Sequence, residues 1–116
     1  MKQRNLILVR HGQSEWNEKN LFTGWENPGL TNKGKCEAEN AGKLIKNLDI
    51  TFDYLFTSAL IRAQLTGSII LSQINQEEIP IFKDKALNER FYGDLQGLNK
   101  DECREKWGDE QVQIWR

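Results

Sequence analysis

The feature that most constrains the fold is the alternation of short apolar runs with longer segments of helical periodicity. The predicted first strand, Asn5–Val9, contains a continuous apolar run of the kind found in parallel strands that are buried on both faces. A second strand is predicted at Asp53–Thr57 and a short third one at Ile79–Lys83. Because helical patterns lie between these runs, the sequence predicts an α/β fold without repeats or linkers.

Capping residues indicate where the helices begin. Ser14 is the predicted N-cap of a short helical turn over residues 14–19, and Thr31 is the predicted N-cap of the helix that follows. Ser58 is expected to cap a third helix, while Asn99 and Glu102 resemble a capping box for a last helix. The second and third helices should each bury an apolar stripe, formed by Ala38, Ala41, Leu44, Ile45 and Leu48 and by Ala59, Ala63, Ile70 and Ile74.

Composition excludes several classes of protein. The 116 residues are enough for one domain, or for one piece of one, and 16 basic residues against 17 acidic ones argue against a general nucleic-acid or anionic-membrane binder. The apolar run Leu6–Val9 is too short to span a bilayer, and residues 1–5 are too few for a signal peptide. One histidine and two cysteines cannot supply the roughly four ligands of a structural zinc site. We therefore expect a soluble, reduced, cytoplasmic protein without a metal.

Charged residues follow the predicted strands at the sheet edge where ligands bind in parallel α/β proteins. Arg10 and His11 come directly after the first strand, and Arg62 lies one turn into the helix after the second. Roughly three quarters of an unperturbed histidine is neutral at pH 7, so His11 is a nitrogen nucleophile beside an anion clamp. A phosphoryl group is the matching electrophile, because arginines bind its oxygens and no metal is required. Glu89 is a third candidate, since a carboxyl group can exchange a proton with the attacking or leaving oxygen.

Each candidate also has a purely structural interpretation. The triplet Arg10–Gly12 is typical of a turn that ends a strand, Arg62 of a solvated helix residue, and Glu89 of a local ion pair with Arg90. Side chains that we expect to serve only in packing or as ordinary helix positions are Trp16, Trp25, Trp107, Trp115, Cys36 and Cys103. The residues by themselves support anion binding with possible phosphoryl chemistry, and they name no substrate.

Five motifs, which follow one another along the chain, resemble those of a known family. Residues 8–17 (LVRHGQSEWN) resemble the signature of the histidine phosphatase superfamily, in which the histidine becomes phosphorylated. Residues 22–25 (FTGW), 57–63 (TSALIRA), 87–100 (LNERFYGDLQGLNK) and 108–116 (GDEQVQIWR) resemble motifs of its cofactor-dependent phosphoglycerate mutases. The run 87–100 separates these mutases from most plain phosphatases. The resemblance covers the chain from about Leu6 to its last residue.

The resemblance implies a three-layer α/β/α fold with a mostly parallel sheet, of which residues 1–116 form a single partial domain without the C-terminal part. It implies that His11 is the phosphohistidine nucleophile and that Arg10 and Arg62 clamp the transferring phosphoryl group. Glu89 is implied as the proton donor and acceptor for the glycerate hydroxyl. Substrate binding is implied for these residues and also for Gly12, Gln13, Ser14, Glu15, Trp16, Asn17, Thr23, Gly24, Arg90, Phe91, Tyr92, Lys100 and Arg116.

The implied reaction is the glycolytic interconversion of 2-phosphoglycerate and 3-phosphoglycerate by ping-pong phosphoryl exchange. The implied cofactor is 2,3-bisphosphoglycerate, which primes His11, and no metal takes part. The implied partners are small-molecule phosphoglycerates, with neither nucleic acid nor membrane, and the resemblance suggests a homodimer or homotetramer.

One departure from the family is large. Family members continue well past the position of Arg116, and their second catalytic histidine comes from that later part, whereas no histidine follows His11 here. In the family fold the later part also supplies strands that pair with the first one, so Leu6–Val9 is expected to expose unpaired backbone and an apolar face. We therefore expect this chain to be weakly active or inactive. The alternatives are a phosphatase of the same superfamily and a non-catalytic remnant, either unfolded or binding phosphoglycerates without transfer.

Overall fold

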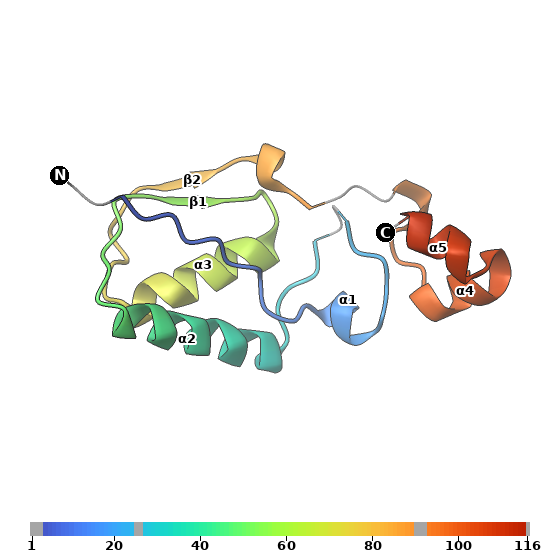
Figure 1. Ribbon diagram of the computed structural model, residues 1–116, viewed down its shortest axis with the longest axis horizontal. Coiled ribbons are helices and arrows are strands. Elements are labelled where there is room, and N and C mark those ends of the chain that lie inside the picture. The colour runs from blue at the N-terminus through green and yellow to red at the C-terminus, as the bar shows by residue number, and fades with distance from the viewer. Residues whose placement is uncertain (1–3, 25–26, 90–92, 116) are drawn as a thin grey trace.

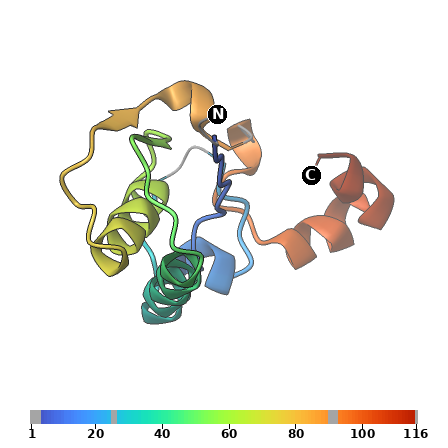
Figure 2. The same ribbon diagram turned by 60° about the vertical axis from the view of Figure 1, so that its left-hand side comes forward.

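The structure is a computed structural model that describes residues 4–24, 27–89 and 93–115. The molecule is elongated, with principal extents of 54, 28 and 21 Å, and its last two helices lie at the end opposite its two long helices (Figures 1 and 2). The elements are, in chain order, α1 (Glu15–Glu18), α2 (Asn32–Asn47), β1 (Leu55–Thr57), α3 (Ile61–Gln73), β2 (Ile81–Lys83), the 3-10 turns η1 (Lys85–Leu87) and η2 (Gly93–Leu95), α4 (Lys100–Trp107) and α5 (Asp109–Trp115).

The sheet of the described residues consists of β1 and β2. The two strands are parallel, with Phe56 opposite Phe82, and α3 forms the crossover that a parallel pair requires. Both strands lie within the predicted segments Asp53–Thr57 and Ile79–Lys83 and begin two residues later than predicted. The predicted α/β class with a parallel sheet is confirmed.

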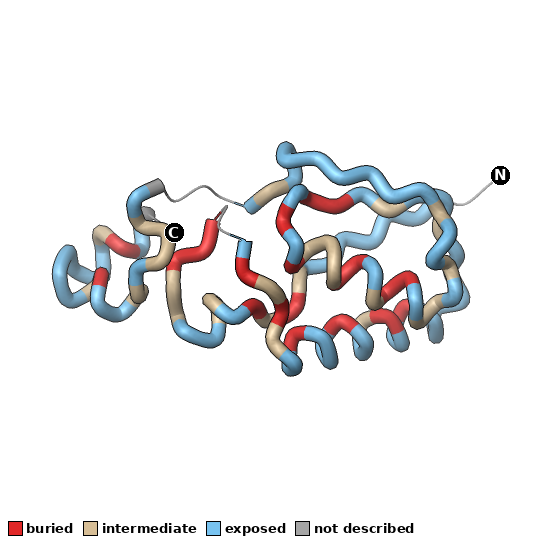
Figure 3. Tube along the Cα trace, turned by 180° about the vertical axis from the view of Figure 1, so that it is seen from behind, coloured by how far each residue is buried: buried red, intermediate tan, exposed pale blue. Residues whose placement is uncertain are grey.

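Helices α2 and α3 form a layer on one face of this sheet (Figure 1). Gly42 lets the two helices approach closely, because a Cβ atom there would lie 2.7 Å from Cβ of Gln73. Gly67 does the same between α3 and β1, where a Cβ atom would lie 2.9 Å from Cδ2 of Leu55. Buried residues therefore follow the line along which α2 and α3 face each other (Figure 3).

The predicted apolar stripes are only partly buried. On α2, Ala38 and Ile45 are buried, whereas Leu44 is 67% exposed and Leu48 is 59% exposed. The predicted stripe was too wide, because α2 packs against α3 and the turn at Gly12 and Gln13, which leaves Leu44 and Leu48 exposed. Ala59 is also exposed, since it precedes α3 rather than lying within it.

The prediction that Asn5–Val9 is a strand buried on both faces is wrong for this chain. Residues 4–10 form no strand and no bridge with another described residue, and each of them is exposed. Among the apolar residues of this segment, exposure is greatest for Leu6 (82%) and Leu8 (87%). The physical reason is that a strand is buried only when neighbours pair with its edges and cover its faces. The described residues supply no partner strand here, and they cover Ile7 (37% exposed) and Val9 (46% exposed) only in part. The expected exposure of unpaired backbone and apolar side chains is thus confirmed.

The face of the sheet that α2 and α3 do not cover is also apolar. Tyr54, Phe56 and Phe82 are between 48% and 64% exposed, and the rings of Phe56 and Phe82 stack with their centroids 5.3 Å apart. Parallel sheets normally have both faces covered. The described residues therefore contain the sheet and one helical layer of the three-layer arrangement.

Three of the four predicted helix caps are confirmed. Ser14 and Asn17 form a capping box at α1, the Thr31 hydroxyl accepts from the Gly34 N–H, and the Asn99 side chain accepts from two N–H groups of α4. The prediction for Ser58 is wrong, because Leu60 is the N-cap of α3 and makes no side-chain cap. The backbone stays extended at Leu60, so the helix begins too late for Ser58 to reach its first turn.

The predicted last helix is in fact two helices. Gly108, with φ of 88°, separates α4 from α5. Phe22, Cys103 and Val112 form a small core that joins these helices to the loop before residue 24. Backbone hydrogen bonds reinforce this junction, from the Phe22 N–H to the Leu98 carbonyl (2.9 Å) and back from the Gly97 N–H to the Phe22 carbonyl (2.8 Å).

Candidate active site

His11 lies where the N-terminal segment turns toward α1. Its Nδ1 atom is 2.7 Å from the carbonyl oxygen of Gly12. A carbonyl oxygen only accepts hydrogen bonds, so Nδ1 donates to it, and Nε2 is the ring nitrogen that faces Glu89. The side chain is 13% exposed. The ring is thus oriented with the nitrogen that can act as a nucleophile pointing away from the main chain.

Arg62 and Glu89 converge on this imidazole. Glu89 Oε1 lies 3.8 Å from Nε2 of His11 and accepts a hydrogen bond from Nη2 of Arg62. The same Nη2 donates to the carbonyl oxygen of Gly24 at 2.6 Å. The Arg62 side chain is completely buried, which contradicts the alternative that it is a solvated helix residue. Three residues far apart in the sequence thus form one cluster.

The local structure explains why these side chains meet. Arg62 lies in the first turn of α3, just after the carboxyl end of β1, and Glu89 follows β2 after the short turn η1. Asn88 holds that last segment beside α3, because its side-chain oxygen accepts from the Ala59 N–H at 2.9 Å. Neither Asn88 nor the Gly24 carbonyl was predicted as an orienting group. For Asn88, the only signal in the sequence is its position next to Glu89. A backbone carbonyl leaves no signal in the sequence.

The electrostatic environment keeps Glu89 ionised. Burial raises the pKa of this carboxyl group, but the opposing effects of His11 and Arg62 are larger together and lower the pKa below its ordinary value of 4.5. At neutral pH, Glu89 is therefore a carboxylate that can accept a proton.

Replacing Glu89 by glutamine is expected to remove a stabilisation that depends on pH. Because the pKa is lower in the folded chain than in the unfolded one, ionised Glu89 stabilises the fold above pH 4.5, and this stabilisation is lost as the pH falls through the lowered pKa. Glu89 is partly exposed, so we expect a difference of about 1 kcal/mol or less at neutral pH. The measurement is the urea midpoint of wild type and E89Q between acid and neutral pH.

The matched control for this measurement is E105Q, at an exposed glutamate of α4. Its difference from wild type should stay small at every pH, since no ion pair holds Glu105 in the described residues. A wild type–E89Q difference that does not shrink in acid would contradict the assigned environment of Glu89.

Arg10 is exposed and makes no ion pair with another described residue. It lines a hollow of about 210 Å³ together with His11, Thr66 and residues of α2. Its predicted role as a second phosphoryl clamp is compatible with this position beside the imidazole and stays a prediction.

Several predicted substrate-binding residues hold the backbone in place. Asn17 accepts from the Ser14 N–H at 3.2 Å, the Thr23 hydroxyl donates to the Leu21 carbonyl at 3.3 Å, and Gln13 Oε1 accepts from a threonine hydroxyl. Ser14 and Thr23 are buried. These groups shape the loops around His11, and their predicted contacts with substrate stay untested.

The remaining predicted binding residues that the structure describes lie on α1 and at the start of α4. Glu15 is exposed on α1, Trp16 is half-buried, and the Lys100 ammonium lies 5.9 Å from the Phe22 ring centroid at the start of α4. The predictions for Arg90, Phe91, Tyr92, Arg116 and Trp25 lie outside the described residues.

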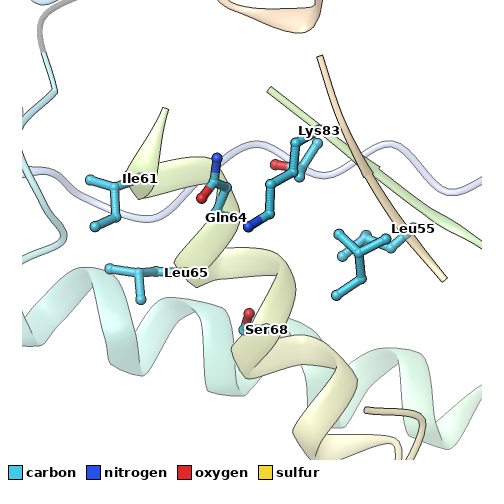
Figure 4. Close-up of a pocket in the computed structure, with 8 residues that line it drawn as sticks. Leu55, Ile61, Gln64, Leu65, Ser68 and Lys83 are labelled. Carbon is cyan, nitrogen blue, oxygen red and sulfur yellow. The ribbon is translucent and has the colours of Figure 1, made fainter. Parts of the chain in front are cut away.

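Other features of the described residues lie apart from this cluster. A second hollow, of about 240 Å³ and open to solvent, lies between α3 and the sheet, where Gln64 and Lys83 point toward the same space (Figure 4). Burial raises the pKa of the Cys103 thiol, which lies in the small core beside Phe22 and Val112. Within the described ranges, no group of three or more His, Cys, Asp or Glu side chains could hold a metal ion, and no helix is long and apolar enough to cross a membrane.

A parallel α/β sheet that gathers a histidine, a buried arginine and a carboxylate at one site is the arrangement expected of a histidine phosphatase. Residues 6–116 match the histidine phosphatase superfamily (branch 1). The chain belongs to this superfamily.

Two relatives show which members of the superfamily the chain is similar to. Over 113 residues the chain is 62% identical to the 2,3-bisphosphoglycerate-dependent phosphoglycerate mutase of Bartonella quintana (strain Toulouse), which covers 97% of this chain and 55% of that protein. The enzyme of the same name from Nitrobacter winogradskyi is 61% identical over 116 residues, covering 100% of this chain and 56% of the relative. The chain thus spans about half the length of the curated relatives that it matches.

Solved structures show the same fold. The phosphoglycerate mutase of Bacillus anthracis superposes with a TM-score of 0.74 at 26% identity, over 88% of this chain and 51% of that one. The alpha-ribazole phosphatase of Shigella flexneri superposes with the same score of 0.74 at 29% identity, over 89% and 48% of the two chains. The fold is therefore a phosphoglycerate mutase-like one, truncated relative to these structures.

Proposed function

We propose that residues 1–116 are the N-terminal part of a phosphoglycerate mutase, an isomerase that interconverts 2-phosphoglycerate and 3-phosphoglycerate through a phosphohistidine at His11. The observation that carries this proposal is the convergence of His11 Nε2, the buried Arg62 guanidinium and Glu89 in one cluster. The identity of about 61% to mutases supports the substrate class.

The geometry accounts for each half of the transfer. Nε2 of His11 attacks the phosphorus of the substrate, a nitrogen–phosphorus bond forms, and the bond from phosphorus to the glycerate oxygen breaks. The bond from Nδ1–H to the Gly12 carbonyl supports the positive charge that develops on the ring. Arg62 and Arg10 neutralise the phosphoryl oxygens, each contributing on the order of 4 kcal/mol at about 4 Å before desolvation.

Glu89 accepts and donates the proton of the glycerate hydroxyl. As a carboxylate near Nε2, it accepts the proton of the glycerate hydroxyl that receives the phosphoryl group from His11. In the opposite direction, Glu89 returns the proton that it has accepted to the glycerate oxygen as that oxygen leaves. The proton therefore stays within the cluster while the phosphoryl group moves.

The residues present fit the proposed cofactor at its reacting phosphate. The completely buried Arg62 guanidinium supplies N–H donors suited to a phosphate dianion, and His11 presents Nε2 at the same cluster, 3.8 Å from Glu89. Arg62, Arg10 and His11 would hold that phosphate. When bound, 2,3-bisphosphoglycerate supplies the phosphoryl group that primes His11.

We propose that this chain by itself has weak or no activity. His11 is its one histidine, so a second imidazole for the exchange is lacking. The unpaired segment Leu6–Val9 and the exposed aromatic residues Tyr54, Phe56 and Phe82 are surfaces that the rest of the relatives' length would cover. The site is therefore expected to reach its working geometry only when that part is supplied.

The test is a chimera in which residues 1–116 are followed by the part of the Bartonella quintana mutase beyond the matched region, hereafter the completed chain. We expect the completed chain to convert 2-phosphoglycerate into 3-phosphoglycerate, and residues 1–116 alone to do so weakly or not at all. A completed chain that folds and shows no turnover would contradict the proposal.

A phosphatase of the same superfamily is the second candidate, favoured by the likeness to the alpha-ribazole phosphatase structure. The completed chain discriminates the two, because a phosphatase passes the phosphoryl group from His11 to water. Release of inorganic phosphate from 2,3-bisphosphoglycerate that is faster than exchange between the monophosphates would favour the phosphatase.

A further inference from the structure

The turn that carries His11 is held from one side by α2. The contact is between backbones, because a Cβ atom at Gly34 would lie 2.1 Å from the Gln13 carbonyl oxygen, and one at Gly12 would lie 2.2 Å from the Gly34 carbonyl oxygen. The Gln13 carbonyl also accepts from the Thr31 N–H at 2.9 Å. Such a contact leaves the turn no freedom to move toward α2.

Thr66 of α3 holds the same turn from the other side. Its hydroxyl oxygen accepts from the Gly12 N–H at 3.2 Å and donates to the Arg62 carbonyl at 2.8 Å. The residue is 4% exposed and lies one helical turn after Arg62. One buried hydroxyl therefore joins the neighbour of the nucleophile to the helix that carries the buried arginine.

We infer that Thr66 is a positioning residue, which fixes the His11 imidazole relative to the Arg62 guanidinium and Glu89; this inference rests on the proposed function. The single hydroxyl proton is used by the Arg62 carbonyl, so a lone pair of the oxygen faces the Gly12 N–H. Without that acceptor a buried N–H loses its partner, and the turn loses its hydrogen bond to α3 while its contact with α2 remains.

A small displacement of the His11 imidazole should lower the rate of phosphoryl transfer strongly. A displacement of about 1 Å between a nucleophile and its substrate costs on the order of 10²-fold in rate. The Thr66 hydroxyl is engaged by the Gly12 N–H and the Arg62 carbonyl, so we expect its removal to lower the rate of transfer more than the binding of substrate.

Three variants of the completed chain test this. T66V removes the hydroxyl at similar shape, T66S keeps it, and S68A is the control at an exposed serine of the same helix. We expect kcat to fall at least about tenfold in T66V with KM changed less than about threefold, and T66S and S68A to stay within about threefold of wild type. A T66V kcat within about threefold of wild type, or T66S as impaired as T66V, would overturn the inference.

A second measurement does not depend on catalysis. The 116-residue chain has one histidine, so its NMR spectrum carries a single set of imidazole signals. E89Q should shift these signals, because Glu89 lies 3.8 Å from Nε2. In the T66V background, E89Q should shift the imidazole signals by no more than about half as much as in wild type, because coupled residues have non-additive effects in a double-mutant cycle. In the T66S background, the shift caused by E89Q should be preserved.

The two measurements separate the possible failures. If the completed wild-type chain shows no turnover, the proposed function fails, and the NMR cycle still decides on Thr66. An E89Q response in T66V that equals the wild-type response overturns the positioning role even where turnover is present. The urea midpoint of each variant shows that it is folded.

Discussion

Replacing His11 by alanine is expected to abolish phosphoryl transfer in the completed chain, lowering kcat by at least about 10⁴-fold. The reason is chemical, because Nε2 of His11 is the proposed nucleophile, which would divide the exchange into two steps. The folded state should change little, since the ring makes one short hydrogen bond, to the carbonyl of the next residue. The measurements are turnover of 2-phosphoglycerate and the urea midpoint of wild type and H11A.

H11N is the companion variant, because asparagine keeps a polar side chain and lacks a basic ring nitrogen. It should be as inactive as H11A. Either variant retaining more than about a tenth of wild-type turnover would show that another group receives the phosphoryl group.

Replacing Arg62 by alanine is expected to damage both the fold and the transfer. Removing one partner of a buried ion pair costs about 3–5 kcal/mol, and because Glu89 stays partly exposed we expect about 2–3 kcal/mol here. Loss of a preorganised donor to the phosphoryl group should lower kcat by about 10²–10³-fold. R62K should lie between these limits, since lysine keeps the charge but lacks the fork that reaches Gly24 and Glu89 together.

The matched control is R104A. Arg104 also pairs with a carboxylate, Asp101, at 2.6 Å, but both side chains are at the surface of α4, and the change should cost less than about 0.5 kcal/mol. Unfolding in urea and turnover are measured for all three variants. If R62A is tolerated as well as R104A, Arg62 is not the buried anion clamp that we describe.

Local features of this fold could be predicted from the sequence. The caps at Ser14, Thr31 and Asn99 were predicted correctly because a cap depends on a few neighbouring residues. The strand at Asn5–Val9 was not, because an apolar run is buried only where other parts of the chain surround it. Ser58 was misassigned for a related reason, since the path of the chain after β1 decides where α3 begins.

The site could be predicted in part. The rule that ligands gather at the carboxyl ends of parallel strands, together with the motifs, identified His11, Arg62 and Glu89, and the structure brings these three together. The sequence does not predict the roles of the Gly24 carbonyl, Asn88 and Thr66. Their contacts join segments that are distant in the sequence, and nothing in a lone threonine or glycine indicates which backbone group it will meet.

The most direct test of the central claim is the phosphorylation state of His11 itself. The completed chain is incubated with 2,3-bisphosphoglycerate, and the peptide that contains residues 8–17 is analysed by mass spectrometry. We predict one acid-labile phosphoryl group on His11, which disappears when 3-phosphoglycerate is added because it is transferred to that substrate. Turnover with no phosphate on His11, or with the phosphate on a different residue, would contradict the account.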